Sequence, residues 1–430
     1  MPQILNSNDT DFDHRFSALL ERSRSSHTEI GPVVSDIIKS IRQEGFPAVA
    51  ALTKKFDKLE VDECSVAVTV SDVERAMSSC DAEDIAALRF AADRIRLFHE
   101  KQLPEDTLYQ DEEGMTLGWR WTPVQRAGLY APGGMASYPS SVLMNAIPGK
   151  IAGVKKLTLC VPTPGGEVNP LVLAAAKISG IDEIYKIGGA QAIAAMAYGA
   201  GPVEPVDVIV GPGNAYVAEA KRQVFGQVGI DAVAGPSEIL VVADGENNPA
   251  WIAADLLSQA EHDPSSQSIL ITDDGAFAEK VIASANQQLE SSPRKKITQE
   301  AWGGNSAVII VNDLEQSVPL IDRIAPEHLE LAVSSPEALM SKVNNAGAIF
   351  LGRYTPEAVG DYVAGPDHVL PTAGCARYAS GLSVLNFMKR TSIIGCDKSA
   401  LQKIGPSAVR LANAEGLLAH AHSINVRLKD

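Results

Sequence analysis

The chain has 430 residues, of which 45% are hydrophobic and 21% charged, and its formal net charge is −16. That length is too great for one typical hydrophobic core, so we expect a soluble globular protein with two or more domains. The excess of acidic residues argues against nucleic acid and against an anionic membrane surface as partners.

Cysteine usage and the apolar runs bear on the compartment. The five cysteines are scattered, odd in number and form no C-x-x-C pair, which suits free thiols in a reducing compartment. No apolar run approaches membrane-spanning length, and the first residues lack the charged and apolar regions of a signal peptide. We therefore expect a cytoplasmic protein with no membrane partner.

Helical periodicity dominates residues 11–101, where apolar residues recur three and four positions apart. The valine-rich run at 66–70 predicts a short strand within this region. We expect residues 1–125 to form a helical N-terminal part that packs with the second of two sheet domains. The first sheet domain would then be an insertion.

Residues 126–236 alternate between short apolar runs and helical patterns, which predicts a parallel sheet covered by helices. Glycine-rich turns at 131–134, 188–191 and 211–214 follow its strands. Glycine lets the backbone approach a ligand closely, and the helix N-terminus that follows favours a phosphate at the carboxyl ends of the strands. None of the turns reads G-x-G-x-x-G, so turns that serve packing alone are an equal alternative.

A second alternating array covers residues 237–382. The fold class is therefore expected to be α/β, with two incomplete Rossmann-like parallel-sheet domains. Residues 383–430 read as an irregular segment followed by a helix at 407–424. This small C-terminal helical tail is too short for a core of its own, so it must dock on another part of the protein or on a second subunit.

A first group of chemically suggestive residues ends the helix that begins at Pro249. Gln259 and His262 stand at i and i+3, so their side chains share one face. An amide oxygen and an imidazole placed together can hold a metal ion. Taken alone, the pair is also explained by a capped helix end with a solvated histidine.

A second group is Glu327 and His328, which follow Pro326. Proline favours the first position of a helix, so we expect both residues in the first turn of a helix that starts there. A carboxylate beside an imidazole is a common acid/base pair. The alternative is a helix N-terminus that favours glutamate because of its dipole.

A third group lies in the glycine-rich segment 360–368. Asp361 is a candidate metal ligand there. Asp367 and His368 are equally explained as residues that shape a turn.

A fourth group lies in the tail, where Glu415 and His420 are five residues apart. The two can face one cleft only if their helix lies across it. His420 and His422 do not share a helix face, so at most one of them is expected to be a ligand.

Five separated segments resemble the histidinol dehydrogenase family in sequence and in order, and together they span most of the chain. They are AGPSE at 234–238, ADLLSQAEH at 254–262, APEHLEL at 325–331, GPDHVLPT at 365–372 and EGLLAHA at 415–421. The resemblance implies a zinc enzyme that oxidises L-histidinol to L-histidine, the last step of histidine biosynthesis. It implies two NAD⁺ used in succession, with L-histidinal held as a bound intermediate.

The resemblance also implies roles for individual residues. His328 would take the alcohol proton, and Glu327 would activate water for the second oxidation. The implied zinc ligands are Gln259, His262, Asp361 and His420. The implied substrate contacts are Ser237, Gln259, His262, His328, Asp361, Glu415 and His420, and the implied NAD⁺ positions are Tyr130, Gln191 and Asn214. The tail would reach the partner's active site in a homodimer, so Glu415 and His420 would come from the other subunit.

Two other functions fit parts of the sequence. One is a dehydrogenase of the same scaffold that oxidises another small amino or sulfo alcohol. Glu415 favours histidinol, because a carboxylate suits a cationic amine and repels a sulfonate. The other is a nucleotide-binding regulator with a structural zinc, in which Glu327 and His328 would be incidental. The roles of His368 and His422 are left open.

Overall fold

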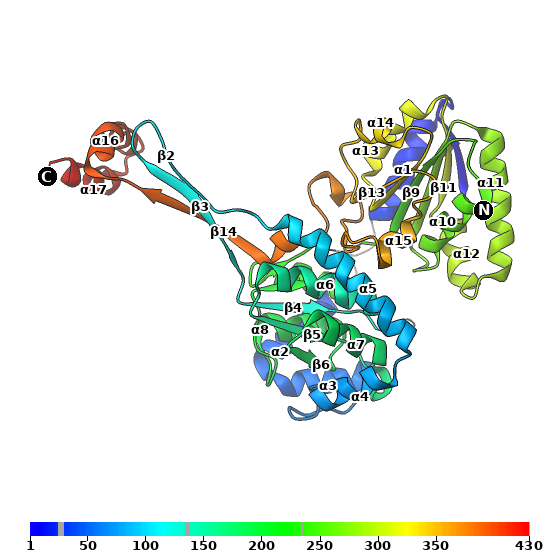
Figure 1. The fold of residues 1–430 in the computed structure, drawn as a ribbon, viewed down its shortest axis with the longest axis horizontal. Coiled ribbons are helices and arrows are strands. Elements are labelled where there is room, and N and C mark those ends of the chain that lie inside the picture. The colour runs from blue at the N-terminus through cyan, green and yellow to red at the C-terminus, as the bar shows by residue number, and fades with distance from the viewer. Residues whose placement is uncertain (25–29, 134–137, 234, 430) are drawn as a thin grey trace.

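The computed structural model describes residues 1–24, 30–133, 138–233 and 235–429. Two helix-covered sheets make up the body of the molecule, and a narrow arm extends away from them to the C-terminal helices (Figure 1). No helix in the described part of the chain combines the length and the apolar character needed to cross a bilayer.

The first sheet has five parallel strands in the order β6-β5-β4-β7-β8. Its strands are β4 (Arg126–Tyr130), β5 (Lys156–Cys160), β6 (Glu183–Tyr185), β7 (Val208–Val210) and β8 (Gly229–Ile230). Helices α6 (Pro139–Ala152), α7 (Pro170–Ser179), α8 (Gly189–Tyr198) and α9 (Ala215–Val224) connect them. This order is that of a Rossmann sheet without its last strand, and the chain reverses direction across the sheet between β4 and β7.

The second sheet has six parallel strands in the order β1-β11-β10-β9-β12-β13. Its strands are β1 (Gln3–Asn6), β9 (Glu238–Ala243), β10 (Gln267–Thr272), β11 (Ala307–Ile310), β12 (His328–Ala332) and β13 (Ala348–Leu351). Its helices are α10 (Pro249–Ala260), α11 (Gly275–Ser291), α12 (Lys295–Gly304), α13 (Ser317–Ile324), α14 (Pro336–Met340) and α15 (Glu357–Tyr362). The reversal here lies between β9 and β12, so the predicted pair of incomplete Rossmann-like sheets is confirmed.

The N-terminal helices do not all pack where the sequence suggested. Strand β1 and helix α1 (Phe12–Arg24) join the second sheet, as predicted, through a shared apolar cluster. The other four helices cover the first sheet: α2 (Gly31–Glu44), α3 (Phe46–Asp57), α4 (Val70–Ser79) and α5 (Ala82–His99). The predicted packing of this whole part with the second domain is therefore wrong. Helical periodicity identifies a buried face but not the sheet that covers it.

The predicted strand at 66–70 is also wrong. Helix α4 begins at Val70, where Thr69 caps it through the backbone N–H of Asp72. Only a single bridge from Ala67 to Tyr185 remains of the strand pairing. A capping box therefore determines the structure here in place of the β-branched run.

The arm is a three-stranded antiparallel sheet in the order β14-β3-β2. Its strands are β2 (Thr107–Gln110), β3 (Thr116–Pro123) and β14 (Met388–Gly395), and it carries helices α16 (Lys398–Ala414) and α17 (Leu418–Leu428). The tail was predicted to be irregular before a single helix, and the structure corrects this to a strand and two helices. Pairing between β14 and the distant β3 forms the strand, which no local pattern in the tail specifies.

Candidate active site

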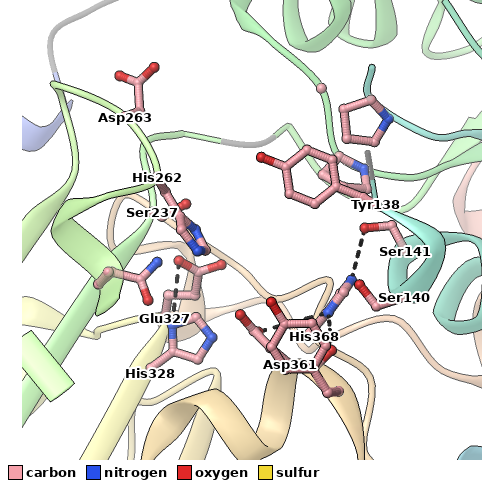
Figure 2. A pocket seen from close by; sticks show the side chains of 15 residues that line it. Tyr138, Ser140, Ser141, Ser237, His262, Asp263, Glu327, His328, Asp361 and His368 are labelled. Atoms are coloured by element: carbon pink, nitrogen blue, oxygen red, sulfur yellow. Dashed lines mark hydrogen bonds and ion pairs between the residues drawn. The ribbon is translucent and has the colours of Figure 1, made fainter. Parts of the chain in front are cut away.

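A cavity of about 250 Å³ is lined by residues of both sheet domains. The first domain contributes Pro132 and Gly213, and the second contributes Ser237, Gln259 and His328. In Figure 2 the side chains of His262, Glu327, Asp361 and His368 converge on the same space, whereas Asp263 points away from it. The structure thus brings together most of the predicted site residues that precede the tail.

The two sheets present opposite edges to this cavity. Pro132 follows β4 and Gly213 follows β7, so the first sheet contributes the carboxyl ends of its two central strands. Ser237 precedes β9 and His328 begins β12, so the second sheet contributes amino ends. The first sheet therefore faces the cavity with the edge at which a ligand was expected, whereas the second sheet faces it with the opposite edge. Helix α10 returns from the carboxyl edge and brings its last turn, with Gln259, to the amino edge.

Glu327 and His328 do not lie in the first turn of a helix, which corrects the prediction. Helix α13 ends at Ile324, the next residue Ala325 is left-handed, and β12 begins at His328 in register with Ile239. All five residues of β12 are buried, so the segment that follows Pro326 forms a strand of the sheet. Burial against β9 therefore outweighs the helix-starting preference of Pro326.

His328 has its ring orientation fixed by the sheet. Its Nδ1 lies 2.9 Å from the carbonyl oxygen of Glu238, which can only accept, so Nδ1 carries the proton and Nε2 bears the lone pair. Burial lowers the pKa of His328 to about 4, so the ring is neutral near pH 7. The neutral imidazole presents a free base atom, Nε2, to the site.

Glu327 is a buried carboxyl beside this histidine. Its Oε2 accepts the backbone N–H of Glu238 at 2.9 Å and lies 3.7 Å from Nδ1 of His328. Burial raises the pKa of Glu327 well above its ordinary value of 4.5. A carboxyl whose pKa is raised is a stronger base when ionised, so Glu327 is suited to accept a proton.

The donor atoms around Asp361 fit a divalent cation. Oε1 of Gln259 is buried and has no hydrogen-bond partner among the described residues, a state that is costly without a cation or donor nearby. Gln259, His262 and Asp361 all line the cavity. These three predicted zinc ligands supply oxygen and nitrogen atoms without a thiolate, a set that zinc accepts in catalytic sites.

A second combination of donors overlaps with this set. The ligand atoms of His328, Glu357 and Asp361 lie within 4.8 Å of one another. Nε2 of His328 lies 3.6 Å from Oε1 of Glu357, and a cation between these two atoms would bind both. Burial raises the pKa of Glu357 to about 8. The sequence reasoning missed Glu357, although it stands four residues before Asp361, on the same helix face.

The two tail residues predicted for the site do not reach it within one chain. Glu415 lies between α16 and α17, and His420 lies within α17. Both residues are exposed. These helices are at the far end of the arm, away from both sheets (Figure 1). A single chain therefore lacks the fourth predicted zinc ligand at its own cavity.

The three predicted NAD⁺ positions all lie at the carboxyl edge of the first sheet. Tyr130 ends β4, and its buried hydroxyl accepts the N–H of Gly189 at 3.0 Å. Asn214 caps α9 through the N–H groups of Tyr216 and Val217, and Gln191 is buried in the first turn of α8. Tyr130 and Asn214 thus bond to the backbone in or next to the glycine-rich turns that border the cavity.

Gly211 shows how closely these turns are packed. Its φ is +116°, and a Cβ placed there would lie 2.1 Å from the carbonyl oxygen of Tyr130. Only glycine fits this position without moving the end of β4. Gly134 of the first turn and Ala234 before Ser237 lie outside the described residues, so their predicted turns are not assessed.

His368, whose role the sequence left open, connects the two domains. Its Nδ1 donates to the carbonyl oxygen of Asp361 at 3.0 Å, and its Nε2 lies 3.1 Å from the hydroxyl of Ser141 in α6. With the proton on Nδ1, the hydroxyl donates to Nε2. His368 therefore ties the segment that carries Asp361 to the first domain.

Comparison with known proteins decides the family. The family model described as histidinol dehydrogenase matches residues 20–428. The histidinol dehydrogenase of Rhodospirillum rubrum is 56% identical over 429 residues, which cover 100% of this chain and 99% of that protein. The chain belongs to the histidinol dehydrogenase family.

Two further relatives agree. The histidinol dehydrogenase of Ruegeria pomeroyi is 56% identical over 428 residues, covering 100% of this chain and 99% of that one. The crystal structure of histidinol dehydrogenase from Elizabethkingia anophelis matches with a TM-score of 0.94 at 38% identity, covering 100% of this chain and 98% of that chain. The expected family, fold class and enzymatic character are thus confirmed.

The buried state of Glu327 predicts a pH-dependent gain in stability on neutralising it. Because the pKa of the folded carboxyl is raised, its contribution to stability is full below 4.5 and is lost as the pH rises toward the folded value. Glutamine does not titrate and retains the acceptor for Glu238. Metal-free Glu327→Gln is therefore expected to melt a few degrees above wild type at about pH 8, with the difference shrinking toward pH 4.5.

Thermal unfolding across this pH range measures the effect. The exposed Glu300 of α12 offers a matched control, because Glu300→Gln removes a carboxylate that has water around it. A difference between Glu327→Gln and wild type that is independent of pH would contradict the assignment.

Proposed function

We propose that the protein catalyses the zinc-dependent oxidation of L-histidinol to L-histidine with two NAD⁺, through bound L-histidinal, as the last step of histidine biosynthesis. The observation that carries the proposal is the buried Glu327–His328 pair, which lies between a set of metal donors and the glycine-rich edge of a Rossmann-like sheet. Family membership supports the same reaction. The five free cysteines suit a cytoplasmic location.

Zinc would be held by Gln259, His262 and Asp361 of one subunit and by His420 of another. When bound, zinc supplies a positive charge that orients the amino alcohol and favours its ionised oxygen. The unpartnered Oε1 of Gln259 supports this assignment, because a buried amide oxygen needs a donor or a cation. Ser237 borders the same cavity and would contact the substrate.

His328 would serve as the base of the first oxidation. Its Nδ1–H bond to Glu238 holds the ring so that Nε2 can accept the alcohol proton as hydride leaves carbon. The pKa of His328 is low, so the ring is already neutral and able to accept when substrate arrives.

Glu327 would serve as the base of the second oxidation. Attack of water on L-histidinal gives a gem-diol, from which a second hydride can leave. Glu327 is buried beside His328 and has one carboxylate oxygen committed to the N–H of Glu238, so its other oxygen can take the water proton.

NAD⁺ would bind at the carboxyl edge of the first sheet, near Tyr130, Gln191 and Asn214. The reversal point between β4 and β7 opens toward the cavity, the usual place for a dinucleotide in such sheets. A phosphate at the N-terminus of α9 would compete with Asn214 for the N–H groups of Tyr216 and Val217. Pro132 and Gly213 line the side of the cavity that faces this edge.

A homodimer would complete each site with the partner's tail. Helices α16 and α17 leave large apolar side chains exposed, among them Leu411, Leu417 and Leu418. An extended arm that exposes apolar residues has the form of an element that exchanges between subunits. Glu415 and His420 would then face the cavity of the other subunit, where Glu415 would pair with the substrate's ammonium group.

Zinc content and product yield test the proposal directly. We expect one zinc per chain and two NADH formed per L-histidinol consumed. Chelation should abolish turnover while changing the melting temperature little, because an active-site metal does not hold the fold together. Unfolding on chelation, or turnover without zinc, would contradict the proposed metal role.

The two half-reactions test the proposed bases. Glu327→Gln is expected to slow oxidation of supplied L-histidinal by about 10²–10⁴-fold while changing oxidation of L-histidinol to L-histidinal by less than about tenfold. His328→Asn serves as the comparison and should slow the first oxidation. Equal losses in both half-reactions of Glu327→Gln would overturn its assignment.

Subunit mixing tests the shared site. His262→Ala and His420→Ala should each be inactive alone, because each removes a zinc ligand. Random mixing should restore about one quarter of wild-type activity, because half of the dimers are mixed and each of those has one intact site. No recovery after verified exchange would show that both histidines serve the same chain.

A further inference from the structure

Three carboxyl side chains meet behind the site, on the side of β12 that faces α10. Glu330 of β12 and Glu357 of α15 are 1% and 2% exposed, and Asp255 of α10 is partly exposed. The side chains of Asp255 and Glu330 contact each other at hydrogen-bonding range, and Glu330 also accepts the backbone N–H of Glu357. Ser258 of α10 completes the group by donating to Oε2 of Glu357 at 3.4 Å.

This group joins the three elements that carry the site. Helix α10 also bears Gln259, strand β12 bears His328, and helix α15 bears Asp361. His328 and Glu330 are two residues apart on one strand, so they share a face. Leu329 and Leu331 point to the opposite face, where they join the separate apolar cluster around α1 and α13.

Two carboxyl groups in contact at a buried position share a proton, because both cannot ionise there. Burial accordingly raises the pKa of Glu330 and that of Asp255. Burying such a pair is costly, and an apolar side chain of similar volume would be less so for the fold alone. The carboxyl at position 330 therefore contributes directed hydrogen bonds that a leucine could not.

We propose that Glu330 is a positioning residue of the active site, which holds α10 and α15 at the places on β12 where Gln259 and Asp361 face His328. The proposal rests on the zinc-dependent function proposed above. Glu330 contacts neither substrate nor metal. It acts through Asp255 on the helix that bears Gln259 and through the first N–H of α15 on the helix that bears Asp361.

Zinc affinity of the purified full-length protein tests this proposal, measured by competition with a chromophoric chelator. Glu330→Leu keeps the volume but removes both hydrogen bonds, and it is expected to weaken zinc binding by about 10–100-fold, as loss of residues that orient metal ligands does. Glu330→Gln can donate to Asp255 and accept from Glu357, so zinc affinity should stay within about threefold of wild type.

Leu329→Ala is the matched control. Leu329 is as buried as Glu330 but lies on the opposite face of β12, so its truncation should lower the melting temperature and leave zinc affinity unchanged. If Leu329→Ala weakens zinc binding as much as Glu330→Leu does, general destabilisation explains the loss and the proposal is overturned.

Asp255→Ala keeps the proposal testable if Glu330→Leu does not fold, because Asp255 is partly exposed. It should weaken zinc binding by about tenfold and raise KM for L-histidinol more than it lowers kcat. If either Asp255→Ala or Glu330→Leu binds zinc with wild-type affinity, the proposed positioning role is contradicted. Failure of the wild-type protein to bind zinc or oxidise L-histidinol would instead sink the proposed function, so the two failures are distinguishable.

Discussion

The hydrogen bond from Nδ1 of His328 to the carbonyl oxygen of Glu238 is the contact on which the site depends. It joins the first residues of two neighbouring strands, so the orientation of the ring is set by the register of the sheet. Nε2 is thereby left free on the side where α10 and α15 end. A site attached to strand ends in this way is more exact in its geometry than one built on loops.

Buried carboxyl groups are the main cost of this arrangement. Glu327, Glu330 and Glu357 are all nearly inaccessible to water, and burial raises the pKa of each. The rest of the second domain is densely apolar around β9 and β10, and this packing offsets the cost. The destabilising carboxyl groups thus lie together at one edge of the sheet, where the chemistry is proposed to occur.

The sequence predicted the sheets well and their surroundings less well. Buried parallel strands such as β9 and β10 are continuous apolar runs, which can be recognised locally. Strand β12 was mistaken for a helix because Pro326 precedes it, and the arm was missed because β14 pairs with β3 far away in the chain. Residue type and family resemblance pointed to Gln259, His262, Glu327, His328 and Asp361, which the structure places around one cavity. Glu357 and Glu330 were not, since a glutamate in a helix or strand carries no local sign of burial.

The opposed strand edges divide the cavity by domain, with the glycine-rich turns on one side and the donors around Asp361 on the other. A reaction that needs two hydride acceptors in turn must release the first reduced dinucleotide before the second enters. The glycine-rich turns belong to the first domain, so an exchange of dinucleotide there would leave the donors of the second sheet in place. The L-histidinal of the proposed reaction would then stay bound to those donors during the exchange.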